Sequence, residues 1–324
     1  MNLFRSLIAL TLATVVAGTA SAQTIGFGVN PQGSLYHRIG VAVSKIMNDN
    51  MGVKVRVQPY SGSSTYIPLL NRDEVRFALV NVSDAVNATE GISNFEGRPQ
   101  PNLRLINIMF LLRFTFLVPN DSPVKRAEDL KGLRMPTGFT SQTTVQNLLE
   151  AILASANMTL SDIKPYPTPN VFKGTALLGE GKVQAVSTGA GIAAIQKADI
   201  KLRRHGGVRF VSIGKNIAAM NALVPSSGMV VNPAPHLKGV VAPTTMMAFR
   251  AFLTTNTKSS DEFVYRLIKL LHGNKKDLVA MTKALGTFNP KLMTFDLKGK
   301  KGAVPYHAGA VKFLKEIGQW PPAS

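Results

Sequence analysis

The amino-acid sequence predicts an α/β protein, and two observations support that fold class. Short runs rich in β-branched and aromatic residues alternate with segments whose apolar residues recur every three or four positions. Such alternation is typical of folds in which strands and helices follow one another along the chain. In addition, three loops share one pattern, in which a strand is followed by small hydroxyl residues, glycine and the start of a helix.

The predicted strands differ in how deeply they are buried. Residues 53–60 alternate Val53, Val55 and Val57, which is the pattern of a strand with one buried face. Residues 76–82 are nearly all apolar, as in a central parallel strand. Residues 103–119 are long enough for two strands or for one strand that crosses between domains. Two further strands are predicted at 183–188 and 209–214.

Helices are predicted from apolar residues spaced at a period near 3.6. The strongest pattern spans residues 145–156, and weaker ones span 36–46, 263–271 and 311–317. Residues 164–170 contain three prolines, so we predict an extended, stiff link at that point.

The first 22 residues have the layout of a secretory signal peptide. Arg5 precedes an apolar run at 7–18, and Ala20-Ser21-Ala22 form a cleavage signal, so Gln23 is the expected start of the mature chain. A membrane anchor is the alternative, but twelve apolar residues are too few for a bilayer, which requires about 20. We expect the chain to be exported to the periplasm.

Composition excludes several classes of protein. The chain has no cysteine, which excludes disulfides and thiolate chemistry. It carries 37 Lys and Arg against 18 Asp and Glu, a net charge of +19, but these basic residues are scattered and accompany no nucleic-acid motif. We therefore predict no nucleic-acid partner and interpret the charge as a basic surface.

The three loops are candidate anion sites. They span residues 28–36, 60–66 and 136–144, and each precedes a helix start. Unpaired amides and the helix dipole favour negative charge at that position. If the loops meet at the carboxyl ends of parallel strands, they form one cleft. The predicted ligand-binding residues are Asn30, Gly33, Ser34, Tyr36, Ser61, Ser63, Ser64, Asn81, Arg113, Gly138, Thr140, Ser141, Gln142, Thr143 and Thr188.

Arg113 is the most specific of these candidates. It is a cation inside the apolar segment 103–119, where it captures a ligand carboxylate or, alternatively, points to solvent or pairs with a structural acid. Asp84 is the acid nearest to the loops in sequence and is expected to cap the helix that follows. Because the loops contain no Asp or Glu, the sequence favours an oxo- or dicarboxylate over an amino acid.

Nucleotide and enzyme functions find little support. Pro31 stands where a dinucleotide fingerprint requires its third glycine, and no phosphate-binding P-loop motif occurs. There is no nucleophile elbow, and His37, His205, His236, His272 and His307 are too dispersed for a metal motif. We predict no catalytic residues, no metal and no cofactor.

Several motifs in order resemble the TAXI family of solute receptors for TRAP transporters. The segments "IGFGVNPQGSLYHRIGVAVSKIMN" and "VQPYSGSSTYIPLLNRDEVRFALVNVSDAVNATEG" are similar to the family's first two loops and the strand after them. "DSPVKRAEDLKGLRMPTGFTSQTT" and "VPYHAGAVKFLKEIGQW" resemble its middle and terminal patterns. The sequence departs from the family at Ser63, Arg76 and "GFTSQTT".

This resemblance implies a two-lobed fold of the periplasmic-binding-protein type (type II) with a ligand cleft between the lobes. Residues 23–114 and 222–324 would form lobe 1, and residues 115–221 lobe 2, after the signal peptide 1–22. It also implies a non-enzymatic receptor that delivers a small carboxylate or an amino acid such as glutamate to TRAP membrane permease subunits. The alternatives are a binding protein of another transporter class and a secreted hydrolase.

Overall fold

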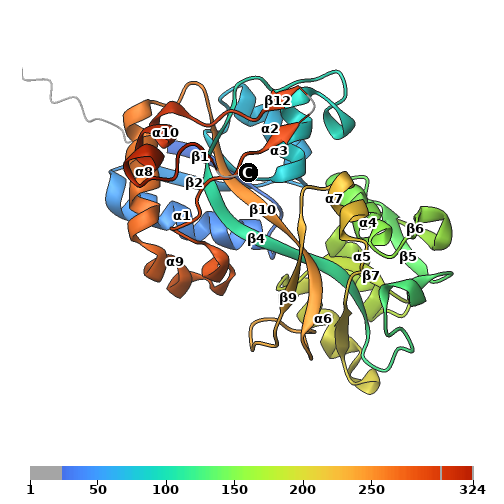
Figure 1. Ribbon diagram of the computed structural model, residues 1–324. Coiled ribbons are helices and arrows are strands. Elements are labelled where there is room, and N and C mark those ends of the chain that lie inside the picture. Colours follow the sequence, from blue (N-terminus) through green and yellow to red (C-terminus); the bar gives the residue numbers. More distant parts are fainter. Residues whose placement is uncertain (1–23, 300, 323–324) are drawn as a thin grey trace, which may run out of the picture.

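Two long antiparallel strands connect the two lobes of the molecule (Figure 1). The computed structural model describes residues 24–299 and 301–322. Strand β4 (Leu103–Pro119) pairs with β10 (Thr244–Asn256) along much of its length, and both run from one lobe into the other. Of the two predictions for residues 103–119, one long crossing strand is therefore confirmed.

Lobe 1 begins with three strand–helix units. Parallel strands β1 (Thr24–Val29), β2 (Lys54–Pro59) and β3 (Phe77–Asn81) are followed by α1 (Leu35–Met51), α2 (Ser63–Asn71) and α3 (Val82–Glu90). Strand β3 also pairs with β10 in antiparallel orientation. The chain returns to this lobe with α8 (Asp261–Gly273), α9 (Lys275–Met281), the short β11 (Lys298–Gly299) and β12 (Gly302–Ala303), and α10 (Ala308–Glu316) (Figure 1).

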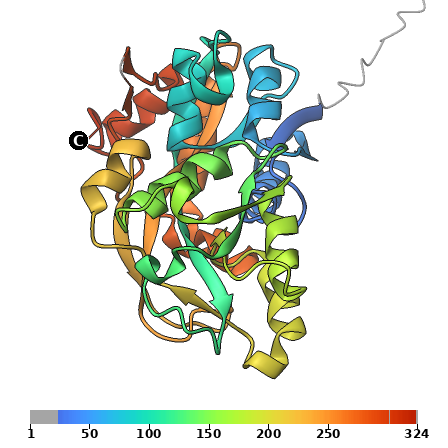
Figure 2. The same cartoon turned by 90° about the vertical axis from the view of Figure 1, so that its right-hand side faces the viewer.

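Lobe 2 repeats the alternation of strands and helices. Its elements are β5 (Arg134–Gly138), α4 (Thr144–Ala154), β6 (Lys164–Thr168), α5 (Val171–Gly179), β7 (Val186–Gly189), α6 (Ala193–Lys201), β8 (Val208–Val211), α7 (Ile217–Leu223) and β9 (Ser227–Val231). Strands β7 and β8 pair with the second half of β4, and β9 pairs with the first residues of β10. Figure 2, turned by 90°, shows this lobe facing the viewer.

Helix α1 illustrates how local sequence sets an element. It begins after Ser34, whose Oγ accepts a 3.0 Å hydrogen bond from the amide of His37. It ends at Gly52, which adopts the left-handed conformation (φ 65°) that favours glycine. Ile39 and Val43, one turn apart, are fully buried. The apolar spacing in the sequence therefore becomes the face that packs on the sheet.

Most of the predicted elements are confirmed. Strands at 53–60, 76–82 and 209–214 correspond to β2, β3 and β8, and the four predicted helices correspond to α1, α4, α8 and α10. The strand predicted at 183–188 lies slightly later, at Val186–Gly189. The helix start predicted after the loop 60–66 corresponds to α2, whereas strands β9 and β10 and helices α5, α6, α7 and α9 were not predicted.

The proline-rich segment 164–170 requires a correction, because it is not only a link. Residues Lys164–Thr168 form β6, which pairs in parallel with β5. Pro165 and Pro167 lie two residues apart, so their missing N–H groups fall on the same side of the strand. Strand β6 has β5 as its partner and lies at the edge of a two-stranded sheet, where proline is tolerated.

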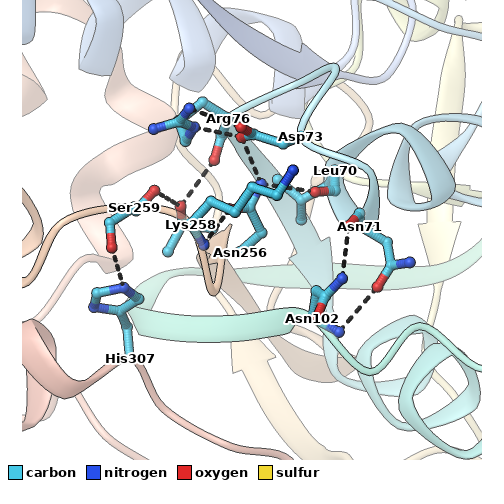
Figure 3. A network of polar contacts seen from close by, with 10 residues as sticks. Leu70, Asn71, Asp73, Arg76, Asn102, Asn256, Lys258, Ser259 and His307 are labelled. Carbon is cyan, nitrogen blue, oxygen red and sulfur yellow. Dashed lines mark hydrogen bonds and ion pairs between the residues drawn. The ribbon is translucent and has the colours of Figure 1, made fainter.

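A polar network ties the turn before β3 to the end of β10 (Figure 3). Asn256 Nδ2 donates to the carbonyl of Leu70 (2.8 Å) and to Asp73 Oδ1 (2.9 Å). Asp73 also accepts two hydrogen bonds from the guanidinium of Arg76. This network lies away from the carboxyl ends of β1–β3 and stabilises lobe 1.

The expected signal peptide, residues 1–22, lies outside the described residues. Within residues 24–299 and 301–322, helices that combine the length and the apolar character needed to cross a bilayer are absent.

A candidate ligand site between the lobes

A cavity lies between the two lobes, next to the crossing strands. Its volume is about 700 Å³ when the open space at its mouth is included. Leu112 of β4 and Phe249 of β10, which pair with each other, both line it. The cavity therefore borders the segment about which the lobes connect.

The N-cap or first residues of six helices surround this cavity. Lobe 1 contributes α1, α2 and α3, and lobe 2 contributes α4, α5 and α6. Each helix follows a strand, so these N-termini gather at the carboxyl ends of the strands in both lobes. The N-caps of α2, α4 and α6 receive no side-chain cap hydrogen bond. At α2 the Ser63 and Ser64 amides have no acceptor among the described residues, so they are available to a ligand. At α6 the Ala193 amide is already engaged, and at α4 the Val145 and Gln146 amides donate to the carbonyls of Gln142 and Thr143.

Lobe 1 supplies most of the polar lining. Its polar residues at the cavity are Asn30, Ser34, Tyr36, Ser63, Ser64 and Asn81. Burial and the nearby charge of Asp84 raise the pKa of Tyr36, so its hydroxyl stays protonated and remains a donor. Asn30 has a buried Oδ1 without a hydrogen-bond partner among the described residues. A buried acceptor without a hydrogen-bond donor is a candidate for contact with a ligand.

Asp84 lies beneath this polar surface and is fully buried. Its carboxylate accepts hydrogen bonds from Ser63 Oγ, Asn81 Nδ2 (2.6 Å), Asn94 Nδ2 (3.3 Å) and Thr144 Oγ1 (2.8 Å). Burial raises its pKa, against the lowering effect of these four donors. The expected capping role is modest, because Asp84 lies in the first turn of α3 and Asn81 provides the N-cap. Instead, Asp84 organises the loops around the cavity.

Contacts between the lobes show a closed arrangement. Thr144 and Asn147 of α4 form hydrogen bonds with Asp84 and with Ser93 Oγ (3.3 Å) of lobe 1. On the other side, the Ala193 amide donates to the Gly33 carbonyl (3.2 Å), and Arg38 donates to the Gly191 carbonyl. The cavity is therefore bordered on two sides by contacts between the lobes.

The structure brings about half of the sequence-predicted site residues together. Those that line the cavity are Asn30, Ser34, Tyr36, Ser63, Ser64, Asn81 and Gln142. Those outside its lining are Gly33, Ser61, Arg113, Gly138, Thr140, Ser141, Thr143 and Thr188.

Most residues outside the lining have identifiable local contacts. Ser61 hydrogen-bonds Thr65 (2.9 Å), and Ser141 Oγ donates to the Pro169 carbonyl (2.9 Å). Gly138 and Thr143 border a shallower hollow beside Ser64.

Two further predicted site residues of lobe 2, Thr140 and Thr188, lie outside the cavity lining and differ in burial. Thr140 is exposed, whereas Thr188 is buried on β7 and its Oγ1 has no partner among the described residues.

Arg113 does not enter the cavity. Its neighbours Leu112 and Phe114 line it, and because side chains alternate along a strand, Arg113 projects from the opposite face of β4. Burial lowers the pKa of His236, and the positive charges of Arg113, Lys283 and Arg38 lower it further. Arg113 thus belongs to a basic region outside the cavity, and we do not include it in the proposed site.

Sequence reasoning missed the apolar part of the lining. These residues are Leu35, Leu112, Phe114, Val145, Leu148, Val171, Phe172, Ile192 and Phe249. Val145 and Leu148 were identified only as part of an amphipathic helix. Thr144 and Gly189 each directly follow a predicted site residue, so the strand-to-helix pattern carried a usable signal for them.

No group of three or more His, Asp or Glu side chains within 24–299 and 301–322 is arranged to hold a metal ion. The polar groups that line the cavity are hydroxyls and amides, and the lining includes no charged side chain from the described residues. These hydroxyls and amides can form hydrogen bonds with a ligand.

The fold has two lobes with a cavity between them. Over residues 27–318 the chain matches the NMT1-like family model, and it belongs to that family. It is similar to a solved structure described as a periplasmic transporter, with 15% identity, a TM-score of 0.56 and coverage of 93% of this chain and 94% of that one.

A second similar structure is the periplasmic aliphatic sulphonate binding protein SsuA from Escherichia coli. The identity is 14% and the TM-score 0.51, and the match covers 93% of this chain and 94% of that one. At these identities the likeness shows the fold alone. The predicted fold class, a two-lobed α/β fold of the periplasmic-binding-protein type, is confirmed.

Proposed function

We propose that the chain is an exported solute receptor that binds a small carboxylate-bearing metabolite between its lobes and delivers it unchanged to a membrane permease. The observation that carries this proposal is the convergence of six helix N-termini, three from each lobe, on one cavity. Amides from both lobes then contact the same ligand, so binding favours the closed arrangement.

The energies of these contacts are sufficient for such a role. A helix N-terminus contributes about 0.3–1 kcal/mol to an anion, and up to about 2 kcal/mol in a partly buried position. Hydrogen bonds to charged groups add about 1.5–3 kcal/mol each. Micromolar affinity requires about 8 kcal/mol. Several helix N-termini and a few hydroxyl donors reach that value without a cation.

We place the anionic head of the ligand at the start of α2. Gly62 is the N-cap there and provides no side-chain oxygen, so the amides at the start of the helix remain free for a ligand. Ser64 and the protonated Tyr36 hydroxyl border the same cavity. Ser63 is engaged with Asp84, so its role is to position the loop.

We further propose that the lobes hinge where Arg113 of β4 pairs with Ala248 of β10. Strand β9 pairs with Thr244–Ala248, which supports assigning residues 222–248 to lobe 2. The first boundary then stays near the predicted residue 114. The second boundary moves from 222 to about residue 249.

The proposed partner is a TRAP-type permease, and the proposed location is the periplasm. The ordered motifs shared with the TAXI receptors support the permease class, and the layout of residues 1–22 supports export. A permease of another transporter class is the alternative, because the fold is shared with a sulphonate binding protein.

The ligand is tested by native mass spectrometry of freshly purified protein, followed by calorimetry with the compound released. We expect one unmodified ligand per chain. The Ser64→Ala variant should weaken binding about tenfold, because it removes one donor to a charged group. Ser61→Ala, in the same loop but outside the cavity, is the matched control and should bind like the wild type. A chemically altered product would contradict the proposal.

Location and partner have separate tests. A periplasmic fraction containing a chain that starts at Gln23 would support export. Crosslinking in native membranes should recover permease subunits, and recovery of an ATP-hydrolysing subunit with them would favour the alternative transporter class.

A further inference from the structure

We infer that the ligand is a monocarboxylate with an aromatic or branched aliphatic tail, and that the cavity disfavours dicarboxylates and amino acids. This inference rests on the proposed function and specifies the ligand class of the same site. It follows from how apolar and polar groups are distributed around the cavity.

Apolar side chains form most of the cavity wall that faces the polar surface of lobe 1, with Gln142 and Thr144 as the polar residues on that side. The helices of lobe 2 contribute Val145, Leu148, Val171, Phe172 and Ile192, and the crossing strands contribute Leu112, Phe114 and Phe249. A ligand whose head lies at the start of α2 therefore directs the rest of its structure toward apolar groups. A hydrocarbon tail matches that wall, because each buried methylene adds favourable transfer free energy.

A second carboxylate lacks a partner in this wall. The described residues that line the cavity include no Lys, Arg or His. Arg113 projects from the other face of β4, and Arg38 is exposed and donates to the Gly191 carbonyl. An unpaired charge inside an apolar cavity is strongly unfavourable. Dicarboxylates should bind weakly for this reason.

An ammonium group is disfavoured by a parallel argument. Asp84 is the acid beneath the polar surface, but it is fully buried and does not line the cavity. Ser63, Asn81, Asn94 and Thr144 all donate to it. A ligand ammonium would have to displace one or more of these donors, so the oxo acid should bind better than the matching amino acid.

The test is a calorimetric panel on dialysed protein, with compounds matched in pairs. Propanoate, butanoate and pentanoate vary the tail length. Phenylacetate adds an aromatic tail. Glutarate adds a second charge to pentanoate, and leucine differs from 4-methyl-2-oxopentanoate at the amino position. We expect affinity to rise about fourfold per methylene, which corresponds to about 0.8 kcal/mol. Glutarate and leucine should bind about a hundredfold more weakly than their partners.

Two variants in α4 test the position of the tail. Leu148 lines the cavity, so Leu148→Ala should shift the preferred acid toward a longer tail. Leu149 is fully buried and lies outside the lining, so Leu149→Ala should keep the wild-type preference. Both substitutions remove packing from the core and are expected to lower stability. The readout is the ratio of affinities for long and short acids within one variant, so a loss of stability common to all ligands cancels.

The outcomes separate this inference from the proposed function. Tighter binding of glutarate or leucine than of their partners would overturn the inference and leave a solute receptor. Absence of any bound acid, in the panel and in the freshly purified protein, would overturn the proposed function. Tighter binding of pentane-1-sulfonate than of pentanoate, with glutarate still weak, would support the apolar tail. It would overturn the carboxylate head, and the inferred ligand would then be a sulfonate.

Discussion

Thr144 of lobe 2 donates a 2.8 Å hydrogen bond from Oγ1 to Oδ1 of Asp84 in lobe 1. The two residues are 60 positions apart in the chain, and both are buried. This hydrogen bond to a carboxylate exists only when the lobes are together. It therefore contributes to closure directly.

Thr144→Val should lower ligand affinity about 10- to 100-fold, because a hydrogen bond to a charged group contributes about 1.5–3 kcal/mol. Small-angle scattering without ligand should show a more open molecule. Thr175→Val is the control, since Thr175 Oγ1 donates to Val171 within lobe 2. Equal losses of affinity in both variants would argue against a role of Thr144 in closure.

Gly62 should be sensitive to even a methyl group. A Cβ on Gly62 would lie 3.2 Å from the Ser141 carbonyl oxygen, which belongs to the other lobe. Gly62→Ala should therefore reduce closure at a cost of about 1 kcal/mol, or roughly fivefold in affinity. Gly273→Ala, with no atom within 4 Å of the added Cβ, is the control. Unchanged calorimetric affinity in Gly62→Ala would contradict the closed contact.

Because of Asp84, the stability of the folded protein should depend on pH in the acid range. Burial raises its pKa above the ordinary value of 3.8, so the folded protein binds this proton more tightly than the unfolded chain. Its contribution to stability is greatest below pH 3.8 and is lost as the pH rises through the raised pKa. Thermal unfolding of the wild type relative to Asp84→Asn should show this fall. A difference that grows with pH in that window would be inconsistent with a raised pKa.

His307 should change stability with pH in the opposite direction to Asp84. The pKa of His307 lies below its ordinary value of 6.5 because the ring is buried. The hydrogen bond to the Ser259 carbonyl (Figure 3) opposes this shift but does not outweigh it. The His307 Nδ1 atom accepts a hydrogen bond from the Gly309 amide, so the neutral ring caps α10. Stability should fall as the pH drops below 6.5, because the unfolded chain takes up the proton first. The difference in melting temperature between about pH 7.5 and pH 5.5 should shrink in His307→Asn.

The sequence predicted those elements whose pattern is local. Helix α4 follows from apolar spacing alone, and β4 follows from a long apolar run. Strand β10 was missed because its stabilising partner, β4, lies more than a hundred residues away, and Thr244–Asn256 carries no periodic pattern of its own. Short helices such as α6 have weak amphipathic character and depend on packing within the lobe.

The candidate site was predictable where it follows a strand-to-helix turn. Tyr36, Ser64 and Asn81 belong to such turns, and all three line the cavity. Arg113 shows the limit of this reasoning, because burial in an apolar segment did not reveal the face of β4 on which it lies. Likewise, Phe249 reaches the cavity only through the pairing of β10 with β4.

The most direct measurement is a crystal structure of the protein with the tightest acid of the calorimetric panel. We expect the carboxylate at the first amides of α2, near Ser64 and the Tyr36 hydroxyl, and the tail against Phe114 and Phe249. A ligand bound outside this cavity, or one that places a charged group against those two phenylalanines, would contradict a receptor site built from helix N-termini and an apolar wall.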